Sequence, residues 1–501
     1  MSSYAQLSDW NPWWRSKQAI YADQEVQNWE KSSFKWLPRL IETFENLDVI
    51  YVLRGPRRVG KTTLLKLKIK HLIESGVKPE NIFFYPCDLI EDPRQLVSII
   101  DLYLSKVRDP SERAFIFIDE ISMLKDWQRG IKVLVDSGKL RNCTVVLTGS
   151  HSIDLKKSTE TLSGRRGEVY KLKYQTPDKL MLPCKFSEYV ETINKNVKEA
   201  IRYFRPLPIG KRRDILLQLG RGEIPKELEK IYLLFSSDLR DLLEDYLIVG
   251  GIAQAIDEYI KTRRVSDNTY ATFINFLIRD ITRWKMNYLY ARQIIRRVIE
   301  TLSTPISWYT LKEGTEIRDP KTAETYVDTL KESFVLLYLY QLDVNNKTPS
   351  YRKDKKIYFQ DPFIFHACRS WIYGKSAFSS SLDFIRTEEN KSKLIECIIS
   401  DHLVRYTFNV YSTPLYDPTN YVFYWKSKKR REVDFIVRIN DKFLPIEVKY
   451  KEKIKRRDAF GIFDFIKTGI SFEYGIIISK ESLKINKKYL EIPAYLFLLL
   501  P

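Results

Sequence analysis

The sequence predicts a multi-domain α/β protein with two chemically distinctive regions. Residues 49–175 alternate apolar, strand-like runs with helical segments, which is the pattern of a parallel sheet covered by helices on both faces. A glycine-rich loop follows the first of these runs. Near the C-terminus, two charged strands between residues 431 and 449 form a hairpin after a long helix-rich stretch. We therefore expect an N-terminal parallel sheet and a separate C-terminal α/β domain.

Length and composition favour a basic, intracellular enzyme. The chain has 501 residues, for which typical domain sizes predict about three domains. Its formal net charge of +19 favours polyanionic partners such as nucleic acid, although solvated lysines can produce the same excess. Five scattered cysteines without a C-x-x-C pair argue against a disulfide framework and a zinc ribbon. His366 and Cys368 lack partner ligands, so we expect them to be ordinary core or surface residues.

The chain shows no targeting or membrane signal. Its first residues are polar and rich in tryptophan rather than arranged as a signal peptide. No apolar run approaches the roughly 18 residues that a membrane-spanning helix needs. We expect a cytoplasmic protein that does not bind a membrane. Residues 1–48 contain several tryptophans and predict an aromatic-rich strap packed on the domain that follows.

A phosphate-binding loop is predicted immediately after the first strand. The segment from Leu53 to Thr63 fits the pattern G-x-x-x-x-G-K-S/T, with an apolar run before it and a helical segment after it. This strand–loop–helix context separates a nucleotide site from a chance match. Lys61 would reach the β- and γ-phosphates of ATP, and the Thr62 hydroxyl would bind Mg²⁺. The predicted nucleotide-binding residues are Gly55, Pro56, Arg57, Arg58, Val59, Gly60, Lys61, Thr62 and Thr63.

The strand at residues 114–119 supplies the second half of this site. It ends in Asp119 and Glu120, the Walker B arrangement, in which Asp119 would hold Mg²⁺ and Glu120 would polarise the attacking water. A third strand, at residues 144–148, ends at Ser150 and His151. Either residue is a candidate sensor of the γ-phosphate, and the alternative is an ordinary polar strand end. The sequence thus predicts a Mg²⁺-dependent ATPase core over residues 49–175.

The middle of the chain is predominantly helical. Residues 176–290 predict a helical lid domain. Residues 291–375 predict two or three helices followed by a two-stranded hairpin, which is the pattern of a winged helix.

A second chemical constellation lies in the last predicted domain, residues 376–501. Alternation places Asp434 on one strand, and Glu447 and Lys449 on the same face of the next. Glu396, on the preceding helix, would complete the set. Two carboxylates and a lysine match the PD-(D/E)xK nuclease arrangement, in which Asp434 and Glu447 would bind Mg²⁺ or Mn²⁺ and Lys449 would orient the attacking hydroxide. The alternatives are a charged hairpin formed by chance and the same fold with a silent site.

The surroundings of this constellation are basic. Between Tyr421 and Asp458, thirteen Lys or Arg residues face six Asp or Glu residues. They favour phosphate contacts, with a solvated surface as the alternative. The interleaved aromatic residues from Tyr421 to Trp425 could stack bases, but we interpret them as core.

Nearly the whole chain resembles archaeal and bacterial AAA-like P-loop ATPases that end in a winged helix and a PD-(D/E)xK nuclease-like domain. Besides the phosphate loop and the two charged strands, the resemblance is carried by Asn11-Pro12-Trp13-Trp14, Thr148-Gly149-Ser150, Leu162-Ser163-Gly164-Arg165-Arg166, Tyr246-Leu247-Ile248-Val249-Gly250-Gly251 and Tyr358-Phe359-Gln360-Asp361-Pro362. It implies that Arg165 or Arg166 acts as an arginine finger toward a neighbouring subunit, and hence a homo-oligomer. Two positions depart from the family pattern. Arg58 stands where the family usually has glutamine, and His151 stands where it usually has asparagine or serine.

Two functions remain open at this point. In the first, the protein is a DNA-processing ATPase whose C-terminal domain grips or cuts DNA. In the second, it is a signalling or defence switch whose nuclease-like domain only binds a partner. The basic C-terminal region and the complete set of Glu396, Asp434, Glu447 and Lys449 favour the first.

Overall fold

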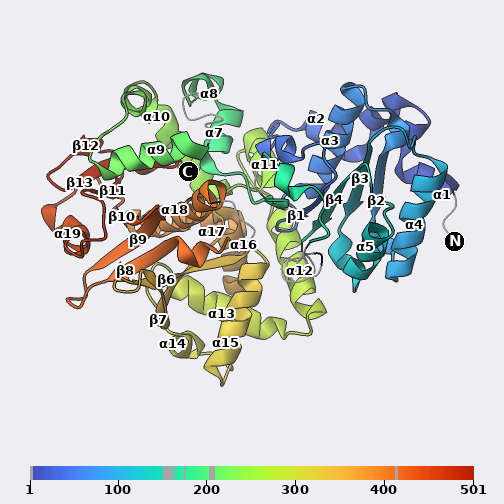
Figure 1. Ribbon diagram of the computed structural model, residues 1–501. Coiled ribbons are helices and arrows are strands. Elements are labelled where there is room, and N and C mark those ends of the chain that lie inside the picture. The colour runs from blue at the N-terminus through green and yellow to red at the C-terminus, as the bar shows by residue number, and fades with distance from the viewer. Residues whose placement is uncertain are drawn as a thin grey trace. The chain divides into compact units, whose positions relative to one another are not determined.

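The chain divides into two compact units, Met1–Leu182 and Pro183–Pro501. The computed structural model describes residues 4–150, 162, 164–173, 176–201, 209–411 and 416–500 (Figure 1). Among these residues, each unit contains one β-sheet. The predicted division into five domains stays a prediction, and His151 lies outside the described residues.

The first unit contains the parallel sheet that the sequence predicts. Its strands are β1 (Ile50–Arg54), β2 (Ile82–Pro86), β3 (Ala114–Asp119), β4 (Cys143–Gly149) and β5 (Asp178–Leu180). Their order is β2-β3-β4-β1-β5, and every neighbouring pair is parallel. Because parallel strands run in one direction, the carboxyl ends of β1, β3 and β4 meet at the same edge of the sheet.

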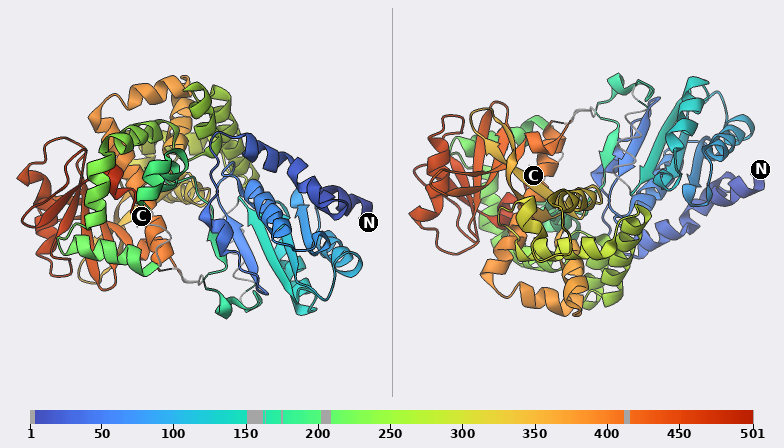
Figure 2. Two further views of the ribbon diagram at one scale, coloured as in Figure 1. Left: turned by 90° about the horizontal axis from the view of Figure 1, so that it is seen from above. Right: turned by 90° about the horizontal axis from the view of Figure 1, so that it is seen from below.

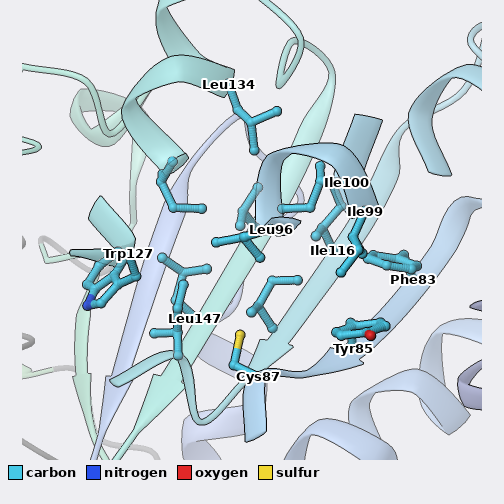
Figure 3. Close-up of a cluster of buried hydrophobic side chains, with 14 of the residues drawn as sticks. Phe83, Tyr85, Cys87, Leu96, Ile99, Ile100, Ile116, Trp127, Leu134 and Leu147 are labelled. Carbon is cyan, nitrogen blue, oxygen red and sulfur yellow. The ribbon is translucent and has the colours of Figure 1, made fainter. Parts of the chain in front are cut away.

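Helices cover both faces of this sheet (Figures 1 and 2). The helices α4 (Pro93–Lys106) and α5 (Trp127–Asp136) pack on one face, against side chains of alternate strand positions such as Phe83 and Ile116 (Figure 3). On the opposite face lies α3 (Lys61–Glu74), whose Lys66 Nζ is 3.7 Å from the ring centroid of Phe84. The period of two along each strand therefore supplies both helix-packing surfaces.

The N-terminal segment closes the edge of the sheet at β2. It contains α1 (Tyr4–Trp10) and α2 (Gln24–Lys31). Between them, the Asn11 side chain accepts from the Phe84 N–H at 2.7 Å and donates to the Phe84 carbonyl at 3.0 Å. The indole N–H groups of Trp13 and Trp14 donate to the Ile82 carbonyl at 3.0 and 2.9 Å. These side chains satisfy backbone groups that an open edge strand would expose.

The second unit begins with a helical region. Its elements are α7 (Phe186–Ile193), α8 (Lys195–Ile201), α9 (Ile209–Gly220), α10 (Lys226–Val249), α11 (Ala253–Thr262) and α12 (Asp267–Arg283). Then follow α13 (Tyr288–Glu300), α14 (Trp308–Lys312) and α15 (Pro320–Glu332), and a hairpin of β6 (Leu336–Asp343) and β7 (Thr348–Phe359).

This hairpin is not a free-standing wing, because β6 continues the sheet of the C-terminal region. The connection is a parallel pairing of β6 with β8 at Gln341 and Tyr424. The resulting eight-stranded sheet has the order β12-β13-β11-β10-β9-β8-β6-β7. Its remaining strands are β8 (Val422–Lys426), β9 (Glu432–Ile439), β10 (Lys442–Val448), β11 (Gly475–Ser479), β12 (Lys484–Ile485) and β13 (Tyr489–Pro493).

Helices α16 (Pro362–Tyr373), α17 (Ala377–Phe384) and α18 (Glu388–Val410) separate the hairpin from β8, and α19 (Phe460–Ile466) and α20 (Ala494–Phe497) follow later. The long helix α18 packs against β7, β8, β9 and β10. Strands β9 and β10 are antiparallel neighbours joined by a tight turn at Asn440, whose φ is 57°.

Burial bears on the aromatic residues of β8. Phe423, Tyr424 and Trp425 are core residues, as predicted, whereas Tyr421 is only partly buried. His366 and Cys368 are buried. All five cysteines are free thiols. In the described part of the chain, the helices are too short or too polar for any of them to span a bilayer.

Candidate functional site

The glycine-rich loop needs glycine for steric reasons. A Cβ atom on Gly55 would lie 2.0 Å from the Met181 carbonyl oxygen, so no larger residue fits between the end of β1 and the backbone at Met181. Gly60 has a φ of 99°, in the left-handed region that favours glycine. Arg58 also has a positive φ, of 64°. The chain then enters α3 at Lys61, so the first N–H groups of a helix border the loop.

Lys61 is buried inside this loop. Its ammonium group donates to the carbonyls of Gly55 and Pro56, each at 3.0 Å, and lies 3.6 Å from Glu120 Oε1. Only 5% of the residue is exposed. The two carbonyl oxygens are acceptors for this buried cation, and phosphate oxygens are acceptors of the same kind.

Thr62 and Asp119 lie side by side at the carboxyl edge of the sheet. The Thr62 hydroxyl donates to Asp119 Oδ2 at 2.6 Å, and the Thr148 hydroxyl at the end of β4 donates to Asp119 Oδ1. Burial raises the pKa of Asp119 above its ordinary value, and the charge of Glu120 adds to this, while the hydroxyl groups of Thr148 and Thr62 oppose it. A divalent cation would reverse this shift, because it favours the ionised carboxylate.

Glu120 is held at the same edge with its backbone in the left-handed region, at a φ of 48°. Its N–H donates to the Thr148 hydroxyl at 3.0 Å, and the Ser150 N–H and hydroxyl donate to Glu120 Oε2 at 3.3 and 3.1 Å. Burial works to raise the pKa of Glu120, but the charges of Lys61 and Arg57 outweigh it and lower the pKa. The carboxylate is therefore ionised and oriented.

These residues fit Mg²⁺ and ATP. Thr62 and Asp119 offer the hydroxyl and carboxylate oxygens that Mg²⁺ prefers, and Lys61 offers a buried cation to phosphate. The sequence expectation that Lys61, Thr62, Asp119, Glu120 and Ser150 belong to one site agrees with their positions, although their catalytic roles stay predictions.

The two arginines of the predicted finger motif have different environments. The Arg166 guanidinium donates to the Ile50 carbonyl at 3.1 and 3.2 Å and to Asp178 at 2.7 Å. Ile50 begins β1, so Arg166 lies at the opposite end of that strand from the phosphate loop. Arg165 is more exposed and pairs with Asp136 at 2.7 Å. Arg166 is therefore engaged in contacts within its own unit, and the finger role of Arg165 or Arg166 stays a prediction.

The second unit gathers the predicted nuclease-like residues around the β9–β10 pair. Asp434 and Glu447 lie opposite each other, and the Asp434 N–H donates to Glu447 Oε2 at 3.2 Å. The Val448 N–H donates to Asp434 Oδ2 at 2.8 Å, and Lys449 Nζ contacts Glu447 Oε1 at 2.5 Å. Glu396, on α18, is buried beside them. We call Glu396, Glu432, Asp434, Glu447, Lys449 and Lys356 the acidic cluster.

Lys356 is the member that sequence reasoning missed. It comes from β7 and is fully buried, with 0% exposure. Its Nζ lies 2.7 Å from Asp434 Oδ1, 2.8 Å from Glu432 Oε1 and 3.5 Å from Glu396 Oε2. The local signal for it was weak, because a lysine in a charged hairpin usually points into water.

Burial and charge oppose each other within the acidic cluster. Burial, together with the charge of Asp434, raises the pKa of Glu447 and of Glu396 above the ordinary value for a glutamate. Burial also acts on Asp434, but the ammonium groups of Lys356 and Lys449 outweigh it and lower the pKa of Asp434. Asp434 is therefore the carboxylate that the two lysines keep ionised.

The basic residues near β8 and β9 separate into free and paired side chains. Lys428, Lys429 and Arg430 occupy the exposed turn between these strands. Arg431 differs, since its guanidinium pairs with Asp464 at 3.1 Å and lies 4.8 Å from the Phe460 ring centroid. The turn therefore presents cations to solvent, whereas Arg431 is engaged in packing.

Comparison with known families identifies the first unit. Residues 47–190 match the model of an AAA domain. Residues 240–372 and 391–495 match two models that are both described as domains of unknown function. An uncharacterised protein of Haemophilus influenzae is 23% identical over 424 residues, which cover 83% of this chain and 86% of that protein.

Three solved structures share low similarity with this chain. The Aeropyrum pernix ORC1 protein in complex with DNA is 12% identical, covering 74% of this chain and 97% of its own, with a TM-score of 0.28. A RuvB variant of Thermotoga maritima is 17% identical, covering 67% and 89%, with a TM-score of 0.23. AMPPCP-bound DnaA from Aquifex aeolicus is 12% identical, covering 58% and 86%, with a TM-score of 0.20.

The first unit is an AAA-like P-loop ATPase domain. The AAA family match spans the phosphate loop, the Walker B strand and β4, which are the segments that bring Thr62, Asp119 and Thr148 together.

Proposed function

We propose that the protein is a Mg²⁺-dependent ATPase whose nucleotide cycle is coupled to DNA bound by the second unit. The observation that carries the enzymatic part is the buried contact network of Lys61, Thr62, Asp119 and Glu120. A cation, a hydroxyl and two carboxylates converge at the carboxyl edge of a parallel sheet, where ligands of α/β proteins bind.

Each of these residues has a distinct role in the proposal. Lys61 binds the β- and γ-phosphates, and Thr62 with Asp119 holds Mg²⁺, which neutralises charge on the phosphates. Glu120 orients the attacking water, for which its ionised, hydrogen-bonded carboxylate is suited. Ser150 fixes Glu120 and senses the γ-phosphate. Arg165 reaches the nucleotide of a neighbouring subunit in a homo-oligomer.

Charge supports DNA as the partner. The chain carries a formal net charge of +19, and the turn between β8 and β9 exposes Lys428, Lys429 and Arg430. Phosphate contacts of this kind bind DNA independently of its sequence. The proposal retains the predicted winged helix, formed by α13 to α15 with the β6–β7 hairpin, and the predicted PD-(D/E)xK-like domain around the acidic cluster. Both predicted fold types contact nucleic acid.

DNA cleavage is not part of this proposal. The sequence predicts a metal-dependent site at Asp434, Glu447 and Lys449, but Lys356 Nζ lies 2.7 Å from the central carboxylate. The same observation favours a second candidate function, a nucleotide-dependent signalling or defence switch whose nuclease-like domain is silent and binds a partner. The two candidates differ in whether DNA affects the ATPase.

Steady-state ATP hydrolysis with and without DNA tests the proposal. We expect single-stranded, duplex or branched DNA to stimulate turnover, and we expect the stimulation to fade with salt, because each phosphate contact releases condensed counterions. Replacing Lys428 and Lys429 with alanine should weaken the stimulation and lower the salt slope of DNA affinity by about one to two. Replacing Lys226 and Lys230, two exposed lysines of α10, removes the same charge elsewhere as a control. Turnover that is indifferent to all three DNA forms would favour the switch.

A further inference from the structure

The acidic cluster contains a charge arrangement that a metal-dependent nuclease site does not need. Resemblance to PD-(D/E)xK domains implies a divalent cation held by Asp434 and Glu447. In this protein, Lys356 reaches the same carboxylates from the β6–β7 hairpin, which lies outside the predicted nuclease-like segment. Lys356 is entirely buried, so its ammonium group has no access to solvent.

The carboxylate oxygens are already engaged by protein donors. Asp434 Oδ1 accepts from Lys356 at 2.7 Å, and Asp434 Oδ2 accepts from the Val448 N–H at 2.8 Å. Glu447 Oε1 contacts Lys449, and Glu447 Oε2 accepts from the Asp434 N–H at 3.2 Å. The Tyr358 hydroxyl donates to Glu396 Oε2 at 3.1 Å. In the described part of the chain, no group of three or more His, Cys, Asp or Glu side chains has the geometry to hold a metal ion.

The residues present therefore do not fit a divalent cation. Metal–oxygen bonds to magnesium are about 2.1 Å long. An ion bound to Asp434 Oδ1 would lie beside the Lys356 ammonium, which is itself 2.7 Å from that oxygen. The metal ion and the ammonium group would repel each other strongly, because both are positive and both would contact the same buried oxygen. Lys356 would have to leave for the ion to enter, and its ammonium group would then lose the carboxylates that offset its buried charge.

The two lysines of the cluster offset part of its negative charge. The cluster holds four carboxyl groups, on Glu396, Glu432, Asp434 and Glu447, and two ammonium groups, on Lys356 and Lys449. Burial disfavours the charged form of Lys356. The charges of Asp434, Glu396 and Glu432, together with Tyr358, outweigh burial and keep the pKa of Lys356 well above its ordinary value. Together, the two lysines supply the charge of one divalent cation.

We propose that Lys356 is a built-in cation that takes the place of the divalent metal ion in the acidic cluster. The cluster then stabilises the junction of β7, β9 and α18 and is silent as a phosphodiesterase. This inference concerns the second unit alone and does not rest on the ATPase or on DNA coupling.

Binding of Mn²⁺ to the full-length protein tests the inference, measured by electron paramagnetic resonance without nucleotide or DNA. We expect the parent protein and Asp434→Asn to bind the same amount of Mn²⁺, because the acidic cluster of the parent binds none. We expect Lys356→Met to gain one Mn²⁺ per chain, which Asp434→Asn then abolishes. Lys355→Met is the matched control, because Lys355 is the adjacent buried lysine and its Nζ lies over the Trp308 ring at 4.8 Å. This variant should gain no Mn²⁺.

Thermal unfolding provides a second readout. Mn²⁺ should raise the unfolding temperature of Lys356→Met and leave that of the parent unchanged, because a ligand stabilises only the state that binds it. Lys356→Arg should behave as the parent. A parent protein that binds one Mn²⁺ through Asp434 would overturn the inference, and so would a folded Lys356→Met that binds none. If Lys356→Met fails to fold, the comparison of the parent with Asp434→Asn decides the question alone.

Discussion

At the scale of single residues, the proposal assigns activation of the attacking water to Glu120. Its carboxylate is 3.6 Å from Lys61 Nζ and accepts two hydrogen bonds from Ser150. We expect Glu120→Gln to keep ATP binding and to reduce hydrolysis by about 100-fold or more, because a carboxamide cannot accept a proton from water. Nucleotide binding by fluorescence and phosphate release measure the two effects separately.

The control for this substitution is Glu112→Gln, the same chemical change at a surface residue that pairs with Lys78. It should leave both binding and hydrolysis unchanged. Lys61→Ala should abolish turnover by a different route, since it removes the cation that the phosphates require. Near-parental hydrolysis by Glu120→Gln would show that another residue activates the water.

Residue chemistry also explains which site members the sequence could reveal. Lys61, Thr62 and Asp119 follow strands within short, patterned segments, so their meeting at one sheet edge could be predicted. Lys356 could not, because its partners lie on β9 and α18, which follow later in the chain, and only the three-dimensional pairing of β6 with β8 brings them together.

At the scale of elements, Asp361 connects α16 to the end of α10. Its carboxylate accepts from the Phe363 N–H at 2.8 Å and from the Gly251 N–H at 2.7 Å. Burial raises the pKa of Asp361 to about 7, although these two N–H groups oppose the shift. The folded protein thus holds this proton more tightly than the unfolded chain, where the ordinary value is 3.8.

This linkage predicts how the stability of α16 depends on pH. The contribution of Asp361 is fully present below about pH 4 and is lost as the pH rises toward 7, by as much as about 4 kcal/mol. Asp361→Asn should flatten this slope, because an amide does not titrate in this range. Hydrogen exchange of the α16 amides, corrected for intrinsic rates, measures it. The control is Asp319→Asn at the exposed N-cap of α15, which measures the effect of the same substitution on stability at a solvent-exposed carboxylate. An unaltered slope in Asp361→Asn would assign the pH dependence to other groups.

The elements also differ in how far the sequence could predict them. Strands β1 to β4 of the first unit were predictable, because each is an apolar run. Strand β5 was not, since it is three residues long, begins with Asp178 and Lys179, and falls in the segment predicted as a helical lid. The hairpin after α15 was predictable as two strands, but its membership in the eight-stranded sheet was not. That membership depends on one pairing, between Gln341 and Tyr424, which are far apart in the chain and carry no local signal for each other.

At the scale of the whole molecule, the proposal requires a coupling free energy between ATP binding in the first unit and DNA binding in the second. Each has its own sheet and its own buried cluster of charges, so neither site is built from the other. Coupling between ATP and DNA must therefore be seen as a change in affinity. Thermodynamic linkage makes such a change reciprocal, so if DNA alters ATP binding, ATP must alter DNA binding by the same factor.

The most direct test is the DNA affinity of Glu120→Gln with and without Mg²⁺ and ATP, measured by fluorescence anisotropy at fixed salt. This variant should hold ATP without consuming it, so the comparison is made at equilibrium. We expect ATP to change the affinity for DNA by at least about fivefold, within the usual range of coupling between two sites. Lys61→Ala in the same background should remove the effect, because it removes nucleotide binding. DNA affinity that is the same with and without bound ATP would contradict the proposed coupling.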